Sequence, residues 1–160
     1  MEESCLEKLK KDYAKLQKKY SLPLFSELNE EFEIEKLQDH ETDFLMRGVR
    51  RSVIEKIAAL MRFFELILNP AEAATPLFVF AILRGIKSET KNAVEKIYKE
   101  LSVYELASLN LDIQYSEKEE VKFVNDFARK WKVIKPGLIK ITKELSIVWK
   151  DEHKERKYLG

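Results

Sequence analysis

FLMRGVRRSVIEKIAALMRFFELILNPAEAATPLFVFAILRGI, residues 44–86, is the stretch that decides the fold. Apolar side chains recur every three or four residues over its first half, which predicts one long amphipathic helix that ends at an Asn-Pro dipeptide. Thr75-Pro76 supplies a cap and a first-turn proline for a second helix. That helix, residues 77–83, has no polar face, so we expect it either in the core or in an interface between copies.

The rest of the chain has the composition of a helical protein. Its 160 residues contain only four glycines and four prolines, while Lys, Glu and Leu are abundant, which favours helices over strands. We therefore predict an all-α fold, a single-domain bundle of about six or seven helices. Its expected segments are an N-terminal helix at 1–20, an acidic connector at 21–43, a helical body at 44–150 and a charged tail at 151–160.

Helical periodicity also predicts which side chains form the core. The apolar positions of each expected helix fall on one face. Placed inward, they give this predicted core: Val53, Ile57, Leu60, Phe64, Phe78, Ile82, Val94, Ile97, Leu101, Val124, Trp131, Ile141 and Leu145.

Three places test these helix assignments. Ser102 and Glu105 have the spacing of a capping box, which predicts that one helix ends and another begins there. Pro136-Gly137 predicts a break or kink further along. Residues 107–115, ASLNLDIQY, alternate apolar and polar side chains as a strand does. No second convincing strand exists to pair with them, so we predict helix.

Three arginines lie near the start of the central helix, at Arg47, Arg50 and Arg51. Helical phasing places Arg50 at the edge of the apolar stripe, where a buried guanidinium requires a carboxylate partner. The acidic connector just before this helix is the expected supplier, which makes the cluster an ion-pair site. The alternative is an anion clamp formed by all three arginines, for which phosphate would be a suitable ligand.

The N-terminal helix carries a short heptad pattern. Ser4 and Glu7 have capping-box spacing at its start. Its apolar seam is either a lid on the chain's own core or an interface with another chain, because two heptads are too few to decide. The seam residues are Leu6, Leu9, Tyr13, Leu16 and Tyr20.

Charge is balanced overall but not along the chain. There are 29 basic and 28 acidic residues, so no global field attracts nucleic acid. Acids crowd the connector at 27–43, around His40, without metal-ligand spacing, and we expect a solvated surface there. The final third is basic and could contact phosphates. The candidate basic surface is Lys130, Lys132, Lys135, Lys140 and Lys143.

No catalytic motif, phosphate-binding glycine loop or cofactor signature is found in the sequence. The lone Cys5 excludes an intrachain disulfide and favours a cytoplasmic location, and no apolar run approaches the ~20 residues that a bilayer requires. We therefore expect a protein-binding or scaffold protein without enzymatic activity or cofactor. Its partner is another protein or itself, as a homodimer. The alternatives, in order, are a nucleic-acid-associated protein and an enzyme or metal protein.

Overall fold

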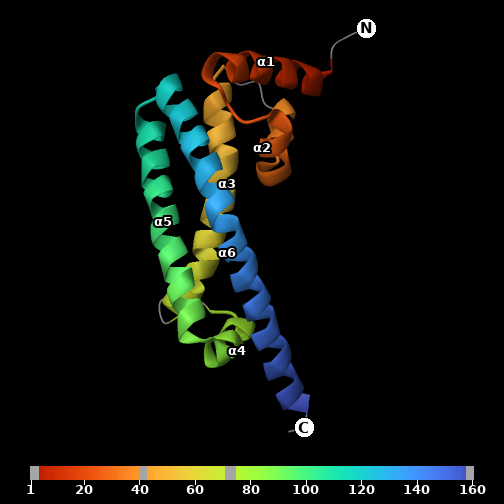
Figure 1. Cartoon of the computed structure of the whole chain (residues 1–160), viewed down its shortest axis with the longest axis vertical. Coiled ribbons are helices and arrows are strands. Elements are labelled where there is room, and N and C mark those ends of the chain that lie inside the picture. The colour runs from red at the N-terminus through yellow and green to blue at the C-terminus, as the bar shows by residue number, and fades with distance from the viewer. Residues whose placement is uncertain (1–3, 40–42, 71–74, 158–160) are drawn as a thin grey trace. The chain divides into compact units, whose positions relative to one another are not determined.

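The computed structural model describes residues 4–39, 43–70 and 75–157, with the backbone alone for residues 153 and 155–157. These ranges are helical and contain no strand, so the prediction of an all-α bundle is confirmed (Figure 1). The helices are α1 (Cys5–Tyr20), α2 (Phe25–Phe32), the 3₁₀ helix η1 (Ile34–Asp39), α3 (Leu45–Leu68), α4 (Leu77–Gly85), α5 (Ser88–Ile113) and α6 (Glu117–Lys157).

Two compact units can be distinguished by their internal packing. The first, which we call unit 1, consists of residues 1–58 and 103–130, and unit 2 consists of residues 59–102 and 131–160. Each unit is thus built from two separate stretches of chain. The long helices α3, α5 and α6 contribute residues to both units.

In unit 1, α1 packs against α2 and η1. The predicted capping box at Ser4 is confirmed, because the Glu7 amide donates to Ser4 Oγ and the Ser4 amide donates to the Glu7 carboxylate. Tyr13 is fully buried, and its hydroxyl donates to the Pro23 carbonyl at 2.8 Å. The unit's buried apolar side chains include Leu28, Phe32, Ile34, Met46, Val49, Val53, Ile57, Leu111, Phe123, Val124 and Phe127.

In unit 2, α4 buries one side only. Val79, Ala81 and Ile82 are at most 4 % exposed, whereas Leu77 is 82 % exposed. Of the two alternatives for this helix, complete burial in the core is therefore wrong, because its outward side is exposed in the part of the chain that the structure describes, and an interface between copies stays a prediction. The unit's buried apolar side chains include Phe64, Ile67, Val94, Ile97, Leu101, Trp131, Ile134, Leu138, Ile141 and Leu145.

Most of the predicted core is confirmed, with two exceptions. Leu60 is half-buried, and Phe78 is 41 % exposed. Ile67, near the end of α3, is buried although the predicted core does not include it. Gly48 of α3 permits a close approach of η1, because a Cβ there would lie 3.1 Å from a Leu37 methyl group.

The predicted helix end at Ser102 and the predicted break at Pro136 are wrong, and one ambiguity is resolved. Helix α5 continues through Ser102, whose hydroxyl donates to the Lys99 carbonyl instead of capping a new helix. Helix α6 continues through Pro136, which lies on the exposed side, where water can hydrate the carbonyl that loses its partner. Residues 107–113 are helical, as predicted.

Candidate functional site

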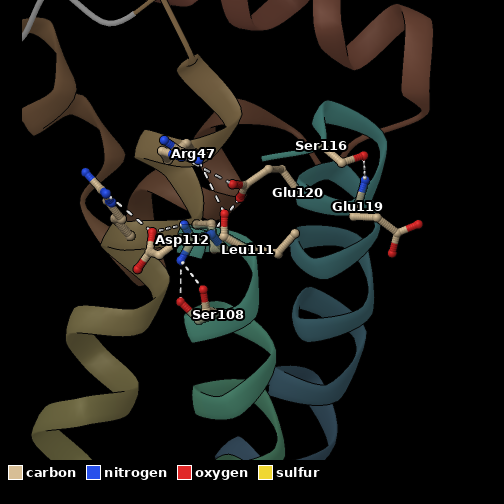
Figure 2. Close-up of polar contacts among 9 residues, drawn as sticks. Arg47, Ser108, Leu111, Asp112, Ser116, Glu119 and Glu120 are labelled. Atoms are coloured by element: carbon tan, nitrogen blue, oxygen red, sulfur yellow. Dashed lines mark hydrogen bonds and ion pairs between the residues drawn. The ribbon is translucent and has the colours of Figure 1, made fainter. Parts of the chain in front are cut away.

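The arginine cluster of α3 lies against α5 and the start of α6 (Figure 2). Arg50 is fully buried. Its Nε donates to Glu120 Oε2 at 2.6 Å, and its Nη2 donates to Asp112 Oδ1 at 2.5 Å. Its Nη1 donates to both the carbonyl and the hydroxyl of Ser108. A buried carboxylate therefore faces a buried guanidinium, with Ser108 and Asp112 occupying the remaining donors.

Ion pairing of Arg50 was predicted, but the predicted partner was wrong. The carboxylates come from Asp112 on α5 and Glu120 on α6, not from the acidic connector. The reason is geometric: Arg50 lies on the face of α3 that packs against α5 and the start of α6, so the carboxylates of those two helices are beside its guanidinium. Sequence proximity was the wrong guide.

The two flanking arginines are less buried. Arg47 donates from Nη2 to the Leu111 carbonyl at 3.3 Å, and its Nε lies 3.6 Å from Glu120 Oε1. Its guanidinium also lies over the Tyr115 ring, 4.8 Å from the centroid. Arg51 is more exposed and donates to Asp112 Oδ1 at 3.3 Å. With its donors directed at protein groups, the cluster is arranged for ion pairing rather than for an external anion.

The same contacts perturb two acid groups nearby. Burial alone would raise the pKa of the Asp112 carboxyl, but the hydrogen bonds and charges of Arg50 and Arg51 outweigh burial and hold that pKa below its ordinary value. Burial raises the pKa of the Tyr115 phenol, and nearby carboxylate charges add to the shift. The cluster is thus charged and locked at neutral pH, which suits a structural anchor.

A groove of about 630 Å³ lies between α5 and α6 in unit 1. We call it the α5–α6 groove. Ser116 forms its end and caps α6, because the Glu119 amide donates to Ser116 Oγ at 3.4 Å (Figure 2). The lining residues that belong to α5 are uncharged, whereas those of α6 include Glu119, Lys122 and Asp126. The lining residues are Val103, Tyr104, Ala107, Asn110, Leu111, Gln114, Tyr115, Ser116, Glu119, Lys122, Phe123 and Asp126.

Beside this groove, α5 presents four exposed apolar side chains. They are spaced three, three and four residues apart, so they lie on one side of the helix. Their exposed fractions range from 59 % to 79 %. We call this set the apolar ridge: Val103, Leu106, Leu109 and Ile113. The sequence interpretation missed it, although the alternating pattern at 107–115 arises because Leu109 and Ile113 point outward while Leu111 points inward.

The heptad seam of α1 packs on its own chain. Leu9 and Tyr13 are buried, while Leu6 and Leu16 are half-buried. Tyr20, also half-buried, donates its hydroxyl to the Glu117 carboxylate of α6. The lid interpretation is favoured by this burial, and contact of the seam with another chain stays a prediction.

The candidate basic surface divides into two groups. Lys132, Lys140 and Lys143 are exposed, whereas Lys130 and Lys135 are half-buried at the flanks of the buried face of α6. The tryptophans of α6 are not free for stacking: Trp131 is 6 % exposed, and Trp149 packs edge-on against Phe78 at 6.3 Å between ring centroids.

Other predicted positions fall outside the described ranges or give no site. His40 lies outside the described residues. Within the part of the chain that the structure describes, no three His, Cys, Asp or Glu side chains are grouped as a metal site would require. None of the described helices combines the length and hydropathy of a bilayer crossing.

Comparison with known proteins gives no relative. No family model matches the chain, and neither a curated protein nor a solved structure is significantly similar to it. Functional inference therefore depends on the molecule's own surfaces.

Proposed function

We propose that this protein is a helical interaction protein without catalytic activity, and that it associates with a second copy of itself through the apolar ridge and the α5–α6 groove. The observation that carries the proposal is the exposure of the ridge. Leu106 is 69 % exposed and Ile113 is 79 % exposed, on a helix whose other side is well packed.

The ridge is unusual for this chain. Charged residues make up 36 % of the sequence, yet residues 103–114 include only two, Glu105 and Asp112. Glu105 is half-buried, and Asp112, whose side chain is 39 % exposed, is paired with the arginines. Contiguous exposed apolar surface of this kind marks interaction sites, because its burial in an interface is favourable by roughly 25 cal/mol per Å².

A second copy is the occupant that this surface fits best. The ridge adjoins a groove whose lining includes the buried apolar side chains of Leu111 and Phe123, and Val103 belongs to both. A projection next to a depression is self-complementary about a twofold axis, since each copy's ridge can enter the other's groove. The uncharged ridge also allows two identical surfaces to meet without like-charge repulsion.

Sedimentation equilibrium over a wide concentration range tests this proposal. We expect the mass of the wild-type chain to rise toward that of a dimer with concentration. Ile113→Lys places a charge on the ridge and should leave a monomer, because burying an unpaired lysine is costly. The matched control is Leu77→Lys on α4, where the side chain is 82 % exposed. This control should associate like the wild type.

A cross-linking experiment examines the contact itself. The exposed Cys5 would be removed by Cys5→Ser, and a thiol would be introduced by Val103→Cys, at a residue that belongs to both the ridge and the groove. When each ridge enters the other copy's groove, the twofold axis lies between ridge and groove, where the two introduced thiols come close enough to form an intermolecular disulfide. A wild-type chain that stays monomeric at high concentration refutes the proposal. So does a dimer that survives Ile113→Lys but is lost in Leu77→Lys.

A further inference from the structure

The exposed side of α6 in unit 2 carries a row of lysines that the self-association proposed above does not use. We define this lysine row as Lys132, Lys140, Lys143 and Lys150, all of which are exposed. At 100° per residue they fall within about 80° of one another around the helix, so they form a single file. The row spans about 27 Å along the helix axis at 1.5 Å per residue.

Little negative charge opposes the row. Between Lys132 and Lys150 the sequence contains one acidic residue, Glu144, and its half-buried carboxylate accepts a hydrogen bond from Thr90 of α5. No ion pair joins any of the four lysines to another described residue. By sequence, unit 2 contains fourteen basic and nine acidic residues. The ammonium groups are therefore available to an external anion.

The spacing selects an extended polyanion over a small one. Lys132 and Lys140 lie about 12 Å apart along the axis, and Lys143 and Lys150 about 10 Å apart. Four groups distributed in this way cannot converge on one phosphate. A regular row of phosphates over 27 Å, which corresponds to about eight base pairs of duplex, can pair with each of them.

The surroundings of the row favour nucleic acid over a membrane. A membrane-surface helix segregates its apolar face from its basic face and buries the apolar one in lipid. The main apolar face of α6 is already buried within unit 2, at Leu138, Ile141 and Leu145. The exposed Ile139 and Ile147 lie among the lysines themselves, so inserting them would carry the ammonium groups into hydrocarbon.

The side chains of the row also favour a double-stranded over a single-stranded nucleic acid, and contact with the phosphate backbone over contact with the bases. Base stacking along the row would require exposed aromatic rings on α6, but Trp131 is buried and Trp149 packs on Phe78. Lysines in a row contact phosphates as point charges and carry no base-reading geometry. We propose that the lysine row is a binding site for the phosphate backbone of double-stranded nucleic acid, without sequence preference.

Salt dependence provides a quantitative test. A fluorescently labelled DNA duplex would be titrated with the full-length protein at several salt concentrations, and binding followed by anisotropy. Four phosphate contacts predict a slope of log Kobs against log salt of about −3.6. The double variant Lys140→Gln/Lys143→Gln should reduce the slope to about −1.8 and weaken binding at low salt.

The control variant removes the same charge from another helix. Lys8→Gln/Lys18→Gln alters two exposed lysines of α1 and should leave the slope unchanged. Thermal unfolding of each variant checks that the fold is retained. The proposal is overturned if no duplex binds at low salt, or if the two double variants lower the slope equally. Binding of the wild type to vesicles of anionic lipid but not to duplex would overturn it in favour of a membrane surface.

Discussion

Removing the guanidinium of Arg50 tests whether the buried cluster anchors unit 1. In Arg50→Met, the Glu120 carboxylate stays fully buried and loses its hydrogen bond of 2.6 Å. Asp112 suffers less, because its side chain is 39 % exposed and water can replace the lost donor. Stranding one buried charge typically costs 3–5 kcal/mol, and Glu120 keeps only the longer 3.6 Å contact with Arg47 Nε, so we expect the free energy of unfolding to fall by about 3 kcal/mol.

A second substitution separates the cost of the stranded charge from any loss of packing. Glu120→Leu alone should cost less than Arg50→Met, because Arg50 keeps Asp112 and the two oxygens of Ser108. The double variant Arg50→Met/Glu120→Leu leaves no unpaired buried charge. Exchange of a buried ion pair for apolar side chains of similar volume is often neutral or stabilising, so the double variant should regain most of the lost stability.

Urea unfolding followed by circular dichroism measures all four proteins of this cycle. The expected result is a strongly non-additive double variant, with a coupling energy of about 2–4 kcal/mol. A loss below about 1 kcal/mol for Arg50→Met would show that water or rearrangement satisfies Glu120 easily. Additive losses in the double variant would show that packing, rather than charge, accounts for the effect. Either result refutes the description of the cluster as an anchor.

Four further predictions concern stability alone, each measured by chemical unfolding. Gly137→Ala should stabilise by about 0.5–1 kcal/mol, because a Cβ there meets its nearest neighbour at an ordinary 3.5 Å. Gly85→Ala should instead destabilise, since its Cβ would lie 2.6 Å from the stiff Val148 side chain. Phe64→Ala should cost about 3–5 kcal/mol because Phe64 is 1 % exposed, and a loss below about 1 kcal/mol would contradict its burial. The pKa of Asp112 is lowered on folding, so the unfolded chain binds its proton more readily as pH falls below about 4. Stability should decline there, and Asp112→Asn should decline less; equal declines would contradict the assignment.

Much of the fold follows from the periodicity of apolar residues. At Arg50, periodicity predicts burial correctly but does not identify the carboxylate that pairs with the guanidinium. Phasing alone placed Arg50 at the apolar stripe and required a carboxylate beside it. Which carboxylate pairs with it depends on how helices distant in sequence pack together. Glu120 is 70 residues away from Arg50 in the chain, and no local pattern connects the two.

The apolar ridge shows a different limit. A periodicity argument assumes that apolar side chains point inward, so Leu109 and Ile113 confused the assignment of residues 107–115 when they in fact face outward. The same assumption placed Phe78 in the core. Helical phasing that assigns every apolar side chain to the core cannot identify the apolar side chains that are exposed.

Local helix signals were also overridden. Ser102 and Glu105 have the spacing of a cap, and Pro136 lacks a backbone donor, yet α5 and α6 continue through these positions. A helix end at Ser102 would disrupt the packing of the turns before and after it. Leu101 and Ser108, on either side of the capping-box spacing, are both buried. Tertiary burial outweighs a contribution of about 1 kcal/mol from a cap.

The discontinuity of unit 1 has a consequence for how the protein is made. Arg50 emerges from the ribosome long before Asp112 and Glu120, because synthesis proceeds at about 5–20 residues per second from the N-terminus. During that interval the nascent chain carries a guanidinium destined for the interior and no partner to neutralise it. Unit 1 can close only after Glu120 has been translated, so a chain that terminates before residue 120 keeps the Arg50 guanidinium without its buried partner. Such fragments should be substrates for quality-control proteases.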